Sequence, residues 1–149
     1  MSKDFDGIQL MWPLPDHIDS ARAYNAISVD QDVDGAHYIG QLEIDPNSNP
    51  FPPVTPAAAM ELMDRYKIDL KGKNVLVVGR SRIVGSPMAH MLRARDAAVT
   101  IAHSQISRED LKTMVGSADI VVSCVGDPGV MKSSWLKKDA EVINIGTTF

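Results

Sequence analysis

In the second half of the chain, short continuous runs of apolar residues are separated by segments in which apolar residues recur at helical spacing. Residues 74–78 (N-V-L-V-V) are β-branched or apolar after the first position, which is typical of a strand buried on both faces of a parallel sheet. Similar runs predict further strands over residues 98–102, 119–125 and 141–145. Between them, residues 85–95 and 107–115 have helical spacing, and Ser107 is placed to cap the second helix. This order predicts an α/β fold, a parallel sheet with helices on both faces.

The first half of the chain has a weaker pattern. Residues 7–11 predict a short strand, which the prolines of the following W-P-L-P stretch end. Residues 19–27 predict a short helix capped by Asp19. Further on, Thr55 is placed to cap a helix and Pro56 to occupy its first turn.

The connection after residues 74–78 has the layout of a dinucleotide-phosphate site. Gly79 allows a tight turn where the strand ends, and Gly85 lets backbone approach a ligand closely where a helix begins. The free N–H groups and the positive end of that helix face the same place, so we expect an anion there. The spacing meets neither the G-x-G-x-x-G nor the P-loop pattern, and an ordinary strand-to-helix turn is the alternative.

Basic and hydroxyl side chains near this turn favour NADP over NAD. NAD sites use a carboxylate after the next strand for the ribose 2′-OH, whereas an arginine and hydroxyls accommodate a 2′-phosphate. Here the next strand is followed by His103 and Ser104, with no acid. Arg80, Arg82 and Ser104 together therefore favour NADP, although each arginine alone is equally compatible with a solvated loop position.

A further candidate is the G-D-P-G stretch at residues 126–129, which follows a predicted strand. Its backbone either contacts the nicotinamide half of a cofactor or forms an ordinary turn, and both interpretations stay open. Gly79, Ser104 and Gly126 all fall at the carboxyl ends of predicted strands, where parallel sheets bind their ligands.

Composition and charge exclude several classes of function. The chain has 149 residues, 44% of them hydrophobic, and a net charge of −4, as expected of one soluble globular domain. It has no basic cluster denser than Lys137-Lys138, so no nucleic-acid partner is expected. Its apolar runs are strand-sized and its amino terminus is polar, so we expect neither a membrane span nor a signal peptide. The single cysteine, Cys124, fits a reducing, cytoplasmic location, and the scattered histidines predict no metal site.

Taken together, these motifs resemble the methylenetetrahydrofolate dehydrogenase/cyclohydrolase family, the bifunctional FolD enzymes. The matching strings are G-I at 7–8, P-L-P at 13–15, D-V-D-G at 32–35, T-P at 55–56, G-R-S-R-I-V-G-S-P at 79–87, H-S at 103–104, and D-I at 119–120 through Gly126. They occur in the family's order and near its spacing. The resemblance implies a Rossmann-like NADP-binding domain over residues 55–149, joined at a T-P hinge to a short remnant of the folate-binding domain over residues 1–54.

The resemblance also implies roles for single residues. Asp34 would bind the pterin ring of folate as the catalytic residue. The other substrate-binding residues would be Met11, Pro13 and Leu14. The phosphates of NADP would be held by Arg80, Ser81 and Ser104. The remaining cofactor-binding residues would be Gly79, Ile83, Val84, His103, Gly126 and Pro128.

The chain departs from the family pattern in ways that bear on activity. The Y-x-x-x-K motif, whose lysine the family assigns to cyclohydrolase proton transfer, does not occur in this sequence, and neither does the family's P-V-P-G-G-V-G-P-M-T segment. Met11 stands where the family has glutamine, and Asn144 where it has aspartate. Hydride transfer mainly needs two well-held ligands, whereas hydrolysis needs a positioned acid or base. We therefore expect oxidation of 5,10-methylenetetrahydrofolate with weak or absent methenyltetrahydrofolate cyclohydrolase activity.

Two alternatives remain beside this reading. In the first alternative, the chain is a non-catalytic NADP-binding fragment. In the second, it is a module that pairs with a partner supplying the missing lysine domain. In either case, members of the family are dimers, and a sheet with few covering elements leaves apolar faces and an edge strand exposed. We therefore expect a homodimer.

Overall fold

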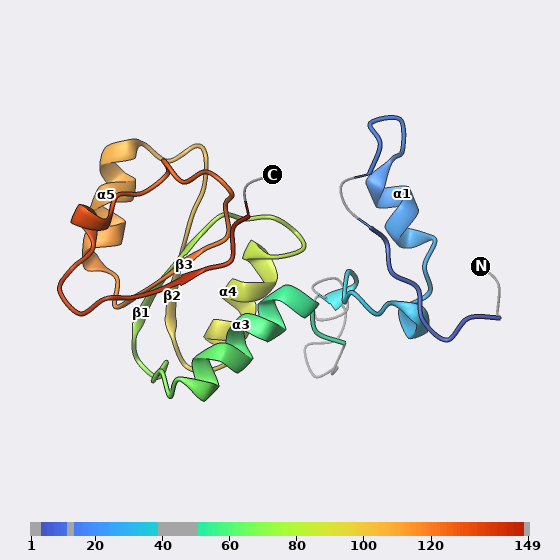
Figure 1. The fold of residues 1–149 in the computed structure, drawn as a ribbon, viewed down its shortest axis with the longest axis horizontal. Helices are drawn as coiled ribbons and strands as arrows, with labels where there is room; N and C mark the ends of the chain where they lie inside the picture. Colours follow the sequence, from blue (N-terminus) through green and yellow to red (C-terminus); the bar gives the residue numbers. More distant parts are fainter. Residues whose placement is uncertain (1–3, 12–13, 39–50, 148–149) are drawn as a thin grey trace. The chain divides into compact units, whose positions relative to one another are not determined.

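The computed structural model describes residues 4–11, 14–38 and 51–147. Its contacts divide the chain into two compact units, Met1–Val54 and Thr55–Phe149. The second unit contains a parallel sheet of four strands in the order β2-β1-β3-β4 (Figure 1). The strands are β1 Asn74–Val78, β2 Ala98–Ala102, β3 Ile120–Ser123 and β4 Glu141–Asn144.

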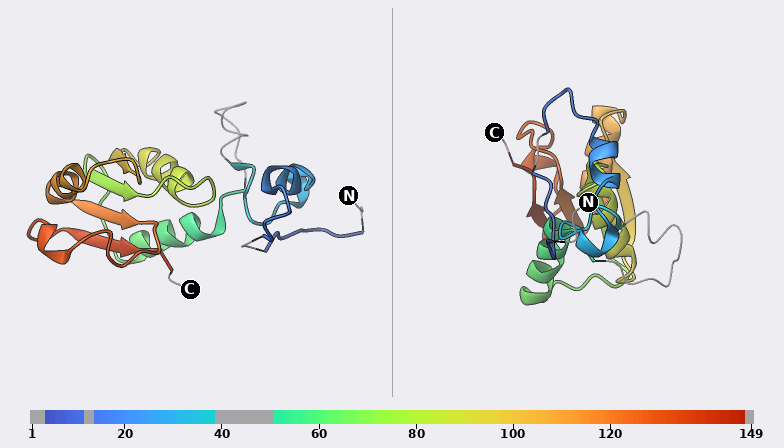
Figure 2. Two further views of the ribbon diagram at one scale, coloured as in Figure 1. Left: turned by 90° about the horizontal axis from the view of Figure 1, so that it is seen from above. Right: turned by 90° about the vertical axis from the view of Figure 1, so that its right-hand side faces the viewer.

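Helices cover both faces of this sheet, as the sequence predicts. The elements are α3 Val54–Arg65, α4 Gly85–Arg93, α5 Arg108–Ser117 and the short 3-10 helix η2 Ser133–Trp135. Apolar side chains of α3 and α4 pack on one face, and those of α5 and η2 pack on the other. Figure 2 lets the reader follow the chain from α3, in green, to β4, in red, from two further sides. The fold is therefore an α/β Rossmann-like fold.

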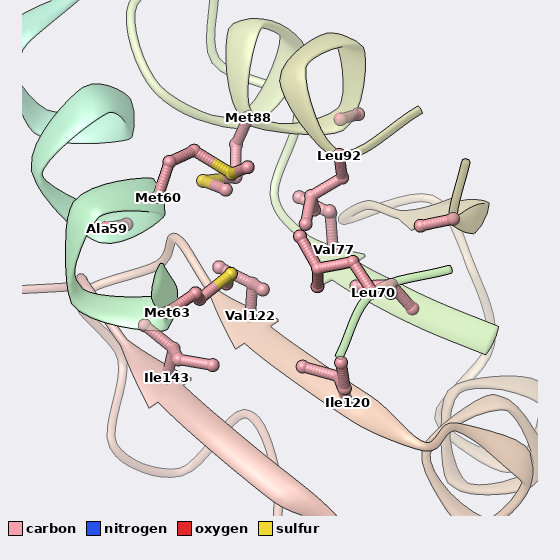
Figure 3. Close-up of a cluster of buried hydrophobic side chains, with 13 residues drawn as sticks. Ala59, Met60, Met63, Leu70, Val77, Met88, Leu92, Ile120, Val122 and Ile143 are labelled. Carbon is pink, nitrogen blue, oxygen red and sulfur yellow. The ribbon is translucent and has the colours of Figure 1, made fainter. Parts of the chain in front are cut away.

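The larger of the two apolar layers lies between the sheet and helices α3 and α4 (Figure 3). Met60 of α3 points toward Met88 of α4. Met63, one turn further along α3, points toward Val122 of β3 and is completely buried. Unbranched methionine side chains can fill the irregular space between two helices and a twisted sheet.

The strand order fixes where a ligand can enter. The chain passes from β1 to β2 on one side, then returns past β1 to β3 on the other. The connections that leave the carboxyl ends of β1 and β3 therefore diverge, and a crevice opens between them. In open parallel sheets this switch point is where ligands bind.

The first unit has little regular structure among its described residues. Helix α1, Ser20–Asn25, begins at Asp19 as predicted, because the Asp19 carboxylate accepts the N–H groups of Ala21 and Arg22. The 3-10 helix η1 follows at Val29–Gln31. The strand predicted over residues 7–11 is wrong: only Ile8 pairs, in an isolated bridge to Asp32. Gln9 also contacts Asp34 through its side chain, but no further ladder pair extends this segment among the described residues.

Smaller differences concern the ends of elements. Helix α3 begins at Val54, so Thr55 lies in its first turn and is not its cap. Ser107, by contrast, caps α5 as predicted, since its Oγ accepts the N–H of Asp110. Within the described residues, no helix is both long and apolar enough to cross a membrane.

Candidate functional site

A cavity of about 430 Å³ lies at the carboxyl ends of β1, β2 and β3, at the switch point of the sheet. Its apolar walls are Val78, Ala102, Ile106, Leu111, Val125 and Val130. Its polar and charged residues are Arg80, His103, Ser104, Arg108 and Asp127, and the glycines Gly79 and Gly129 complete the lining. Apolar walls with a few convergent polar groups, in a volume of this order, are typical of small-molecule sites.

Two glycines shape the turn beside this cavity. Gly79 has a positive φ of 116°, a conformation that side chains rarely adopt. At Gly85, an added Cβ would lie 2.3 Å from the carbonyl oxygen of Gly79. The missing side chain of Gly85 therefore allows α4 to pack against the end of β1. From the sequence, we expect Gly85 to allow the close approach of a ligand. In the structure, it allows the close approach of the Gly79 backbone instead.

Ser81 closes the start of α4. Its Oγ accepts the backbone N–H groups of Val84 and Gly85, both at 3.2 Å, and its carbonyl accepts that of Ser86. The expectation that the first N–H groups of this helix are free is therefore wrong. Ser81, Ile83 and Val84 line neither of the two cavities described here, and their roles toward a cofactor stay predictions.

Arg80, His103 and Ser104 do come together at the main cavity, although they belong to two different connections. Nδ1 of His103 accepts the N–H of Gln105 at 3.3 Å, which leaves Nε2 as the ring's donor when the imidazole is neutral. An arginine, a hydroxyl and an imidazole N–H are groups that bind phosphate oxygens. This end of the sheet can therefore hold an anionic group beside an apolar one.

Sequence reasoning missed two charged residues of this cavity, Arg108 and Asp127. The Asp127 carboxylate accepts the N–H of Gly129 at 2.7 Å, which closes the G-D-P-G turn. Arg108 is the first residue of α5, a position that carries no signal by itself. Only the folded connections bring it to the cavity.

A second cavity, of about 240 Å³, adjoins the first at the ends of β3 and β4. Gly126 and Pro128 line it, as does Asn144, and Val125, Asp127 and Val130 are shared with the main cavity. The G-D-P-G stretch is thus a turn whose residues also face two cavities. The stretch can therefore be an ordinary turn and still contact a bound cofactor, so the two interpretations made from the sequence are compatible.

In the first unit, the D-V-D-G segment is held by a buried carboxylate. Asp32 accepts the N–H of Asp34 at 3.2 Å, and it accepts the backbone N–H of His37 and contacts Nδ1 of that ring, both at 2.9 Å. Gly35 has a φ of 67°, and an added Cβ there would lie 2.6 Å from the backbone of Pro52. Asp34 is therefore presented on a tightly closed turn, where it accepts a hydrogen bond from Nε2 of Gln9 at 3.0 Å.

The other residues expected at the substrate site are less defined. Met11 is 71% exposed, and Leu14 is partly buried. Pro13 lies outside the described residues. Gln9, two positions before Met11, makes the contact to Asp34 and was not singled out from the sequence.

Cys124 follows β3 and contributes no nucleophile. Burial raises the pKa of its thiol to about 11, so that the reactive thiolate is scarce at neutral pH. Its side chain lies under the turn of Gly79, since a Cβ on that glycine would come within 3.2 Å of Cys124 Cβ. The cysteine is a packing residue, as the sequence indicates.

Comparison with known proteins bears on this site directly. Residues 53–149 match the model of the tetrahydrofolate dehydrogenase/cyclohydrolase NAD(P)-binding domain. The chain belongs to the tetrahydrofolate dehydrogenase/cyclohydrolase family. The part of this family member that carries the main cavity is thus its NAD(P)-binding domain.

Relatives of this family member are similar over nearly its whole length. The bifunctional protein FolD of Brucella anthropi is 46% identical over 143 residues, which are 94% of this chain and 47% of that protein. A crystal structure of the Trypanosoma brucei methylenetetrahydrofolate dehydrogenase-cyclohydrolase, FolD, complexed with NADP and an inhibitor, is 40% identical with a TM-score of 0.88 and covers 96% of this chain and 49% of that one. The silkworm (Bombyx mori) methylenetetrahydrofolate dehydrogenase is 33% identical with a TM-score of 0.88, over 99% of this chain and 54% of that one. The chain therefore spans about half the length of these relatives.

Proposed function

We propose that this chain binds NADP and oxidises 5,10-methylenetetrahydrofolate to 5,10-methenyltetrahydrofolate, with little or no hydrolysis of the product. The observation that carries the proposal is the cavity at the switch point, where Arg80, His103 and Ser104 surround apolar walls. Membership of a family with an NAD(P)-binding domain supports it.

The residues of this cavity fit NADP. Its volume of about 430 Å³ suits the adenosine part of the cofactor, and its aliphatic walls suit the faces of an adenine ring. Arg80 and Ser104 offer a guanidinium and a hydroxyl to a 2′-phosphate. Gly126 and Pro128, in the adjoining cavity, would line the nicotinamide half.

Dehydrogenation asks little acid–base chemistry of the protein. A bound NADP would supply the acceptor for the hydride that leaves the methylene bridge of the substrate with both electrons of its C–H bond. Asp34 would hold the pterin ring, and Gln9 keeps its carboxylate oriented through a 3.0 Å hydrogen bond. Hydrolysis additionally needs a positioned acid or base, and the sequence contains no Y-x-x-x-K lysine for this.

Three measurements on the purified chain test the proposal. Calorimetric titration with NADP tests binding, and absorbance assays then follow NADPH formation from 5,10-methylenetetrahydrofolate and, separately, hydrolysis of the methenyl compound. We expect saturable binding, measurable dehydrogenation and slower hydrolysis. Hydrolysis faster than dehydrogenation, or no response to NADP, would contradict the proposal.

Asp34→Asn separates the folate role from the cofactor role. Asparagine keeps the shape of the side chain and removes its charge, so we expect dehydrogenation to fall while the Kd for NADP stays within twofold. An equal loss of both would show that the variant disturbs the fold and not the folate site alone.

A second function is favoured by a specific observation, the poor core of the first unit. Among its described residues, Ile27 is the sole buried side chain of the Val, Leu, Ile, Met and Phe class. The chain would then be an NADP-binding module that relies on a partner carrying the lysine motif. NADP binding without turnover, restored to activity by a co-purified Y-x-x-x-K protein, would favour this function.

We also propose that two copies of the chain pair. Ile101 on the edge strand β2 is 38% exposed, and Val142 on the edge strand β4 is 48% exposed. Apolar side chains on unpaired edges favour association. Light scattering at micromolar concentration should give the mass of a dimer, and a monomer would contradict this proposal.

A further inference from the structure

Arg108 is the cation of the main cavity that no motif of the chain predicts. It starts α5, on the connection that leaves β2, whereas Arg80 lies on the connection that leaves β1. Both arginines line the same cavity, although they lie on different connections of the chain. The lining of the cavity therefore includes two arginines.

The Arg108 side chain is held in place by an aromatic ring. Its guanidinium carbon lies 5.2 Å from the ring centroid of Trp135, within the range of a cation–π contact. Trp135 ends η2 and is itself packed against the apolar layer under α5. A guanidinium held against a packed indole loses less conformational freedom when it binds an anion than a free side chain would.

The charge of this arginine is not neutralised by the ion pairs of the described residues. Arg65 pairs with Glu61 and Arg95 pairs with Asp64, but neither Arg80 nor Arg108 takes part in such a pair. Asp127, the carboxylate in the lining, accepts the N–H of Gly129 and forms no ion pair with either arginine, so the lining carries two positive charges against one negative charge. In a chain whose net charge is −4, two unpaired arginines at one cavity mark a place for an anion.

We infer that Arg108, positioned by Trp135, is a specificity-determining residue that binds the 2′-phosphate of NADP together with Arg80. The inference rests on the proposed binding of NADP and adds a residue to it. A 2′-phosphate carries up to two negative charges, which two guanidinium groups match better than one. NAD lacks this group and gives Arg108 nothing to bind.

Calorimetric titration of the full chain with NADP and with NAD tests the inference. Arg108→Gln should raise the Kd for NADP about 10- to 100-fold, as expected for the loss of one charge-assisted contact. The same substitution should change the Kd for NAD less than about twofold. The matched control is Lys112→Gln, which removes the same charge from α5 one turn further on, outside the lining of the cavity. It should change neither Kd by more than twofold.

Variants of Trp135 test the positioning role. Trp135→Leu should raise the Kd for NADP about two- to fivefold through loss of the cation–π contact, and Trp135→Phe, which keeps a ring, should recover most of it. Circular dichroism checks that each variant is folded, and if Trp135→Leu is not, Arg108→Gln decides alone.

The outcomes separate this inference from the proposed function. If the unaltered chain prefers NADP and Arg108→Gln keeps that preference, or weakens both nucleotides equally, the inference is wrong and the proposed function stands. If the unaltered chain binds no NADP, the proposed function fails and the inference with it.

Discussion

The two units of the chain differ in how much of their own structure they can support. Both apolar layers of the molecule consist of residues from Ala59 onward, whereas Ile27 is the one buried Val, Leu, Ile, Met or Phe side chain among the described residues of the first unit. The second unit therefore carries a core beneath its cavity. The D-V-D-G turn is instead held by polar contacts around one buried carboxylate, Asp32. This contrast predicts that the proposed nucleotide binding outlasts the proposed folate chemistry when the fold is weakened.

The largest expected loss of stability comes from a substitution in the core of the second unit. Met63→Ala removes a completely buried side chain between α3 and the sheet and should cost about 2–5 kcal/mol of unfolding free energy. Urea unfolding followed by circular dichroism measures it. A loss below 1 kcal/mol would mean that the second unit does not depend on this layer.

Ile27→Ala is the matching change in the first unit. Cys124, the single cysteine of the chain, lies in the second unit and reports on that unit alone through its rate of thiol labelling. Because burial raises its pKa to about 11, labelling at pH 8 should be slow until the unit opens. Met63→Ala should speed labelling and Ile27→Ala should not, and equal acceleration by both would refute the independence of the units.

The next effect concerns the turn between β1 and α4. Gly85→Ala places a Cβ against the carbonyl oxygen of Gly79, and we expect a loss of about 1–3 kcal/mol together with weaker NADP binding. Gly116→Ala, in α5, is the control, since its nearest contact is a tolerable 3.4 Å. Thermal unfolding and titration of both variants measure the difference, and equal behaviour would show that the tight packing at Gly85 is not required.

A smaller effect is expected at the cap of α5. Ser107→Ala leaves the N–H of Asp110 without its side-chain acceptor and should cost about 1 kcal/mol. Thr113→Ala removes an exposed hydroxyl from the interior of the same helix and should be close to neutral. Thermal unfolding of the two variants compares them. Equal losses would argue against a capping role.

The smallest effect is a dependence on acid. The Lys137 ammonium and the N–H of Asn74 hold the pKa of Asp119 below its usual value of 3.8, at the amino ends of β1 and β3. A carboxyl whose pKa is lower in the folded state stabilises the fold above its unfolded pKa. This contribution is lost as the pH falls through the folded pKa. Lys137→Met should therefore flatten the acid limb of a plot of stability against pH below about pH 4. An unchanged limb would show that this pair does not contribute.

Sequence pattern predicts the central strands β1 and β3 well because they are mainly apolar runs buried on both faces of the sheet. The bounds of β1 and β2 agree with prediction, although β2 is an edge strand and is exposed at three of its five residues. The expected strand over residues 7–11 fails for the opposite reason, because extended backbone needs a neighbour that pattern alone does not reveal.

The site was predictable only where a motif carries it. Arg80 and Ser104 could be found because each follows a predicted strand. The capping of α4 by Ser81 depends on the path of the loop, and the place of Arg108 depends on how α5 crosses over the sheet. Both contacts need their residue type, but the residue type alone does not place the side chain, so neither has a local signal in the sequence.

The order of the strands leaves the molecule open to redesign. The polar residues Arg80, His103, Ser104 and Asp127 of the main cavity lie on connections at one end of the sheet, while its apolar walls belong to the layer under α5. The segment between β2 and α5 is thus an exchangeable cassette. Grafting an acidic version of it that keeps Ile106, which packs into that layer, would retarget the chain toward the nucleotide without the extra phosphate.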